Sequence, residues 1–178
     1  MAEESELTAY RIYRLKALAA RLYVALVDSD TPLYAIKDPM FGHLELTNAD
    51  ADQVIWKAQS GGAFSFSKKF ISAEYGVLVK FKQGKLFSRT TREFDYVGSQ
   101  YKWRWASWLS DHYDCIRTDN GDDVVVASFK EKAWSRTYGY ITLHNEAKWP
   151  PGLKEFMILS LYFVVEESRR QARQAGGD

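Results

Sequence analysis

Residues 153 to 170 read Leu153-Lys-Glu-Phe-Met-Ile-Leu-Ser-Leu-Tyr-Phe-Val-Val-Glu-Glu-Ser-Arg-Arg170, and from Phe156 to Val165 the run is apolar nearly all round. A membrane span needs about 20 apolar residues, so a run of about half that length is too short to cross a bilayer. A helix that is apolar on every side must instead be surrounded by protein. We therefore predict a buried core helix over residues 153–167, which begins after Pro150-Pro151-Gly152.

The sequence before this helix contains many short segments with the two-residue alternation of β-strands. From Tyr101 to Trp105, for example, aromatic residues alternate with Lys102 and Arg104. The same reasoning, together with turn residues such as Asn120-Gly121, predicts strands at 22–27, 33–37, 43–47, 53–57, 75–82, 89–94, 101–105, 113–117, 124–129 and 138–144. A curved sheet of about 10–12 strands is large enough to enclose the helix. The predicted fold class is therefore β-rich (α+β), a closed antiparallel β-barrel around a central hydrophobic helix.

The length of 178 residues fits one domain. Residues 5–20 mix Leu7, Tyr10 and Ile12 with Ala, Arg and Lys, a composition that suits a helix by propensity. We therefore expect a helical N-terminal extension over residues 1–20, the barrel over 21–170, and a frayed tail over 171–178.

Charge and cysteine content restrict the class of protein. The net charge of +1 excludes a globally basic nucleic-acid binder, so an electrostatic function requires local clustering. Cys115 is the single cysteine, which excludes an intrachain disulfide and indicates a reducing compartment. The first eight residues carry three acids and no apolar run, unlike a secretory signal. We expect a cytoplasmic protein without a cofactor, whose membrane contact would be peripheral.

Several motifs resemble a known family. They are Ser88–Phe94, Gly98–Trp103 with Trp108 beyond it, Val126–Phe129, Ile141–Leu143 and the closing helix Phe156–Val165. Over roughly residues 22–170 the chain resembles the fungal domains of unknown function in the tubby C-terminal-like superfamily, whose relatives include phospholipid scramblases and plant defence-related proteins. The resemblance implies a closed antiparallel barrel filled by a hydrophobic helix. Tubby proteins bind phosphoinositides through basic residues on the barrel exterior, but their ligand residues are not mapped onto this chain.

Positive charge is concentrated between Lys68 and Arg92, where seven cations accompany Glu74 alone. On the predicted strands the outward cations are Lys80 and Lys82, with Lys85 just past the hairpin turn and Lys102 and Arg104 on a neighbouring strand. Such a patch would hold an anionic phospholipid or a phosphorylated small molecule. Ordinary solvated positions that protect strand edges are the alternative interpretation. The sequence favours a non-enzymatic lipid-headgroup module that uses these five residues.

Two other functions remain open. The first is a small enzyme or ligand-binding protein with a pocket at a barrel end, for which the catalytic candidates are His112, Asp114, Cys115 and His144. Strand alternation directs His112 and Cys115 to opposite faces, which disfavours a local nucleophile–base pair. The histidine spacing predicts no metal site, and the acidic stretch 111–123 fits a hairpin turn better than a calcium loop.

The second alternative function is a protein interaction module with an apolar patch near residues 5–20. Trp149 is the aromatic residue expected at a barrel mouth or membrane interface.

Overall fold

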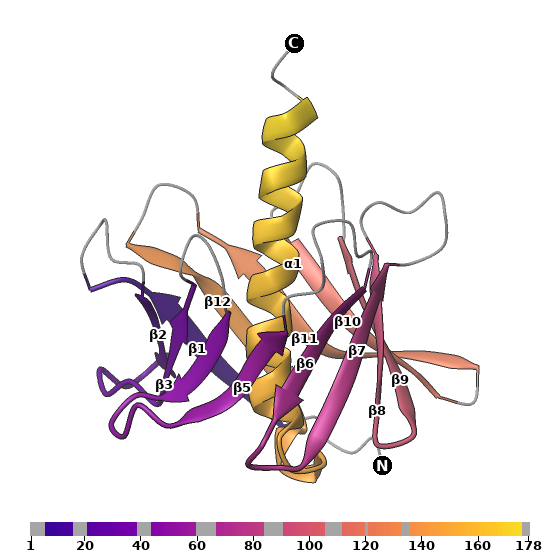
Figure 1. Cartoon of the computed structure of the whole chain (residues 1–178), viewed down its shortest axis with the longest axis horizontal. Helices are drawn as coiled ribbons and strands as arrows, with labels where there is room; N and C mark the ends of the chain where they lie inside the picture. Colours follow the sequence, from indigo (N-terminus) through magenta and orange to yellow (C-terminus); the bar gives the residue numbers. More distant parts are fainter. Residues whose placement is uncertain are drawn as a thin grey trace.

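The computed structural model describes residues 6–15, 21–38, 44–59, 67–83, 91–105, 112–119, 121–132 and 136–175. These residues form twelve strands, one short 3-10 helix and one α-helix (Figure 1). The elements are β1 (Leu7–Tyr13), β2 (Arg21–Leu26), β3 (Tyr34–Lys37), β4 (Glu45–Asn48), β5 (Val54–Gln59), β6 (Ser67–Ser72), β7 (Val77–Gln83), β8 (Arg92–Tyr96), β9 (Ser99–Trp105), β10 (His112–Asp119), β11 (Asp122–Glu131), β12 (Thr137–His144), η1 (Glu146–Lys148) and α1 (Leu153–Ala175).

The twelve strands form a closed antiparallel barrel in which each strand pairs with its neighbours in the sequence. The ring is closed by β1, which pairs with β12 through the register Tyr10↔Ile141 and with β2 through Ile12↔Val24. Among the described strands, closure leaves none at a sheet edge, so every strand has a partner on both sides. The predicted fold class is confirmed.

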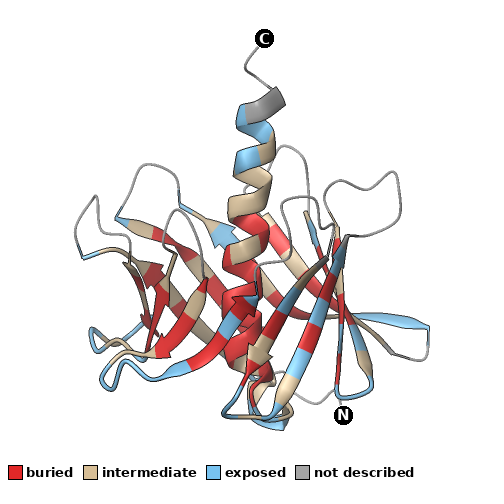
Figure 2. Cartoon of the chain, in the orientation of Figure 1, coloured by how far each residue is buried: buried red, intermediate tan, exposed pale blue. Residues whose placement is uncertain are grey.

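The α1 helix runs through the barrel, and its last turns extend beyond the strands (Figure 1). From Leu153 to Val165 all its residues are buried except Lys154 and Phe163, and exposure begins where the helix leaves the strands (Figure 2). The Phe156 ring lies 5.0 Å from that of Trp56 and 4.9 Å from that of Phe94, measured between centroids. The prediction of a central helix is therefore confirmed. No helix in the described part of the chain is both long and apolar enough to cross a membrane.

The N-terminal segment differs from its prediction. Residues Leu7–Tyr13 are a strand of the barrel wall, not part of a helical extension, so the barrel starts before residue 21. Tyr10 and Ile12 are buried, whereas the residues between and beside them are partly exposed, which is the alternation of a half-buried strand. The β-favouring Thr, Tyr and Ile residues and the available edges of β12 and β2 outweigh the helix propensity of Ala and Arg.

Two further differences concern β6 and the C-terminus. The β6 strand was not predicted, because Ser67–Ser72 contains two adjacent lysines and shows no clean apolar alternation. The other predicted strands all overlap observed ones. The predicted frayed tail is wrong for residues 171–175, which continue α1. Strong helix formers and Arg173 near the negative end of the helix dipole stabilise these last turns.

Candidate functional site

The outward side chains of β5 to β9 carry most of the candidate ligand-binding cations. We call this surface the basic wall; its cations are Lys57, Lys69, Lys80, Lys82, Lys102 and Arg104, and its acids are Glu93 and Asp95. All are exposed or partly exposed, because they alternate with buried residues along each strand (Figure 2). Six cations against two carboxylates give the basic wall a net positive charge.

The densest part of the basic wall lies on β6 and β7. Lys69 stands directly opposite Lys80 in the antiparallel register, and Lys82 follows Lys80 on the same face. Directly opposite residues place their Cβ atoms about 4.5–5.5 Å apart, where like charges destabilise the sheet. Within the described residues, neither Lys69 nor Lys80 forms an ion pair with a carboxylate. The pair therefore costs stability in the free protein.

Lys102 and Arg104 lie farther from this pair than the sequence suggested. The β8 strand separates β7 from β9, and Glu93 on β8 pairs in register with both Lys82 and Lys102. Arg104 stands opposite Asp114 on β10. Carboxylates thus accompany these two cations, whereas Lys69 and Lys80 face each other. The predicted ligand residue Lys85 lies outside the described residues.

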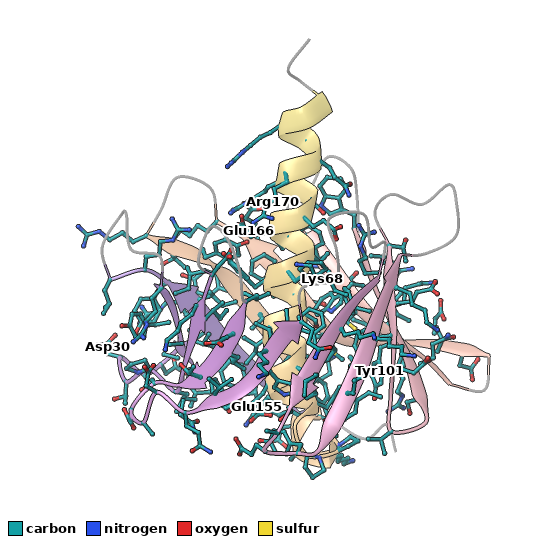
Figure 3. All side chains as sticks on the ribbon, in the orientation of Figure 1. Asp30, Lys68, Tyr101, Glu155, Glu166 and Arg170 are labelled. Carbon is teal, nitrogen blue, oxygen red and sulfur yellow. The ribbon has the colours of Figure 1, made fainter. Side chains whose placement is uncertain are left out.

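Two cations of the stretch 68–92 point into the barrel and are not part of the basic wall. Arg92 is buried, and its Nε donates to Glu167 Oε2 on α1 at 2.8 Å. Lys68 Nζ lies 4.9 Å from the centroid of the Phe163 ring, also on α1. Burial, and then the nearby charge of Arg170, lower the pKa of Lys68. These side chains stabilise the helix within the barrel, near the end from which it emerges (Figure 3).

The catalytic candidates do not come together. Cys115 is fully buried in the core, where burial raises the pKa of its thiol and keeps it protonated. His112 and Asp114 face outward; His112 Nε2 lies 3.1 Å from Asp114 Oδ1, and Ser128 Oγ donates to that same oxygen at 2.8 Å. His144 is on β12, paired with Leu7 at the far side of β11. Neither of these two histidines is therefore placed as a base for the thiol.

No metal centre forms among the described residues, since no three His, Cys, Asp or Glu side chains lie close enough to hold an ion. The acidic turn between β10 and β11 is a tight hairpin in which Asp119 pairs with Asp122. Gly121 there has a φ of 90°, which glycine adopts readily. This geometry agrees with the turn interpretation of the acidic stretch.

A cavity of about 250 Å³ lies at the barrel end where α1 begins. Its walls are Tyr75, Trp149, the carboxylates Glu146 and Glu155, Lys154, and the backbone around Ala147 and Pro150 to Gly152. Figure 3 shows Glu155 at this end of the helix, away from Lys68 and Arg170. Sequence reasoning placed Trp149 at a barrel mouth but missed the other walls, because they come together only when the barrel closes.

Comparison with known proteins gives information on the fold alone. No protein-family model matches the sequence, and a search of curated proteins found no match. An X-ray structure of a protein from Arabidopsis thaliana is similar over 92% of this chain and 91% of that one, with a TM-score of 0.57 and 15% sequence identity. At this identity the similarity supports a shared barrel architecture and carries no residue roles.

Proposed function

We propose that this protein is a non-enzymatic module that docks on anionic lipid headgroups through the basic wall. The observation that carries the proposal is the Lys69–Lys80 pair, which holds two like charges opposite each other without a carboxylate partner among the described residues. Such a pair is unfavourable in the free protein and becomes favourable when an anion lies over it. A phosphorylated headgroup supplies that anion.

The fold supports an exterior site. The buried residues of α1 pack against aromatic residues of the surrounding strands, so the described core is filled by side chains along this part of the helix, which favours binding on the exterior. We also propose that the chain belongs to the tubby C-terminal-like superfamily, because the described parts of the resembling segments fall on β8, β9, β11, β12 and α1 of a barrel that encloses a helix. In that superfamily tubby proteins bind phosphoinositides on the barrel exterior, as the resemblance implies.

The mechanism is electrostatic docking without insertion. Each Lys near an anionic surface contributes about 1 kcal/mol, and the contribution decays within a Debye length of about 8 Å at physiological salt. Lys57, Lys69, Lys80 and Lys82 are exposed and belong to consecutive strands, so they face one surface together. Affinity should therefore fall steeply as salt is added.

The test uses charge reversals of matched size. Lys80→Glu puts an acid opposite Lys69 in place of a like charge, so it should stabilise the fold by about 0.2–1 kcal/mol. The same change removes one favourable charge and adds one unfavourable charge, which should weaken vesicle binding roughly 30-fold. Lys130→Glu, at an exposed position on β11, two strands beyond β9 at the end of the basic wall, makes the same change outside that surface and is the control.

Binding is measured by co-sedimentation with phosphatidylcholine vesicles that contain a phosphatidylinositol phosphate, and stability by urea unfolding. The expected result is weaker binding with a higher urea midpoint for Lys80→Glu, and unchanged binding for Lys130→Glu. Equal binding by both variants, or no binding of the wild type at low salt, would refute the proposal.

A further inference from the structure

Glu155 has one carboxylate oxygen without a hydrogen-bond partner among the described residues. The residue is 8% exposed and lines the cavity. Its Oε1 accepts a hydrogen bond of 2.9 Å from the Tyr34 hydroxyl, while its Oε2 accepts none from any described residue. This oxygen is not shielded from solvent, so a ligand can reach it. No described cation forms an ion pair with this carboxylate, which therefore attracts a positively charged ligand.

The second carboxylate of the cavity is held in a fixed position. Tyr10 donates its hydroxyl proton to Glu146, with distances of 2.7 and 2.9 Å to the two carboxylate oxygens. Glu146 begins η1, which follows Asn145, and Asn145 accepts a hydrogen bond from the backbone of Glu6. Strand β1 and η1 therefore orient this carboxylate before any ligand arrives.

Two aromatic rings complete the walls. The Tyr75 ring packs against Gly152 so closely that a Cβ there would lie 2.4 Å from Tyr75 Cδ2, and Gly152 also has a φ of +82°. Burial, and then the charge of Glu155, raise the pKa of Tyr75 to about 12, so the phenol stays neutral. Trp149 is half-buried beside it in the cavity wall. Neutral aromatic faces next to carboxylates attract cations.

The size of the cavity, which is open to solvent, suits a small ligand. Its volume of about 250 Å³ is larger than the roughly 30 Å³ that one molecule occupies in liquid water. It is smaller than the roughly 300–1,000 Å³ of sites that bind drug-sized ligands. Lys154 lines the cavity, yet it forms no ion pair with Glu146 or Glu155 in the described structure. We propose that this cavity binds a small organic ammonium ion, which Glu155 Oε2 and Glu146 hold by charge and Tyr75 and Trp149 by their ring faces.

Tetramethylammonium chloride is the probe, followed through the Trp149 indole resonance in nitrogen–proton NMR spectra and assigned with Trp149→Phe. Neutral tert-butanol, which has a similar shape, and sodium chloride at equal ionic strength are the comparison solutes. We expect a saturable shift of the Trp149 resonance with tetramethylammonium and a much smaller one with tert-butanol. Equal shifts with both, or no saturable shift, would overturn the proposal.

Four variants test the roles of the charges. Glu155→Gln and Glu146→Gln keep an acceptor for Tyr34 and Tyr10 but remove the charge, and each should weaken binding about tenfold. Lys154→Gln removes a competing cation and should strengthen binding. Asp95→Asn, at an exposed position of β8 outside the cavity, should leave it unchanged.

Two glutamate variants are used because either substitution alone could prevent folding. If Glu155→Gln does not unfold cooperatively, Glu146→Gln decides the question. Unchanged binding in a folded glutamate variant, or weaker binding in Lys154→Gln, would contradict an ammonium site. The basic-wall variant Lys80→Glu changes no residue of the cavity. The vesicle experiment can therefore fail without affecting the ammonium-binding result.

Discussion

Ser160→Ala tests whether α1 is fixed within the barrel by a buried hydrogen bond. The Trp103 indole Nε1 donates to Ser160 Oγ at 3.0 Å, and that hydroxyl donates to the Met157 carbonyl at 3.2 Å. Trp103 and Ser160 are both fully buried. Alanine leaves the indole N–H of Trp103 without an acceptor and out of reach of water. The folded state then carries the full desolvation penalty of this N–H group.

The expected loss follows from two opposing effects. An unsatisfied buried donor costs about 1–3 kcal/mol. Alanine has a higher helix propensity than serine and returns about 0.5 kcal/mol. Ser168→Ala is the matched control, because Ser168 lies on the same helix at a partly exposed position. The two variants should therefore differ in unfolding free energy by about 1–3 kcal/mol.

The assay is urea unfolding followed by tryptophan fluorescence, with thermal unfolding as a second measurement. In a protein of this size each kcal/mol lowers Tm by roughly 2–4 °C, so Ser160→Ala should melt several degrees below Ser168→Ala. The single variant Trp103→Phe and the double variant Trp103→Phe with Ser160→Ala complete a double-mutant cycle. The cycle should give a coupling energy of about 1 kcal/mol between the two side chains. Equal stabilities of the two alanine variants and zero coupling would refute the hydrogen bond and the position of the helix that it implies.

Two more predictions concern titratable groups in the core. Burial and then the charge of Glu155 raise the pKa of Tyr96 to about 12 from its ordinary value of 10, so the folded state holds this proton more tightly than the unfolded chain. The tighter binding of this proton contributes to the free energy of unfolding in full below pH 10, and the contribution is lost as the pH rises toward 12. The Tyr96 hydroxyl donates to the Pro151 carbonyl at 2.6 Å, so Tyr96→Phe, which loses this hydrogen bond, should be less stable than the wild type at pH 8. The difference should narrow between pH 10 and 12 in urea titrations, and a constant difference would contradict this. Cys115 should react with a chromogenic disulfide reagent only as fast as the protein unfolds, because its thiol is buried and protonated; reaction in native buffer at the rate of an exposed thiol would show otherwise.

The central helix and most strands could be predicted because their signals are local. Phe156 to Val165 is apolar on every side, and such a helix can be stable only within a protein core. The alternation from Tyr101 to Trp105 likewise fixes which residues point inward. The segment Leu7–Tyr13 could not be assigned this way, because one of its two partner strands, β12, consists of residues 137–144, more than a hundred positions away. Long-range pairing can outweigh weak local propensity.

The candidate sites were less predictable than the fold, because counting the charged residues of a stretch does not show which way each side chain points. Lys68 and Lys69 are adjacent in the sequence, yet Lys68 contacts Phe163 in the interior while Lys69 faces solvent. Arg92 belongs to the same basic stretch of the sequence and instead pairs with Glu167. The cavity residues Tyr75, Glu146 and Glu155 carry no local signal at all, since only barrel closure brings them together.

The stability and binding effects of one substitution separate a functional surface from ordinary solvated lysines. If Lys80 served only solubility, an acid at that position would improve pairing with Lys69 and change nothing else. If Lys80 binds an anionic surface, the same acid stabilises the fold and weakens binding, so the two measurements move in opposite directions. This outer pair is the most direct test, because both lysines are exposed and stand opposite each other, whereas the described residues around α1 pack together as core.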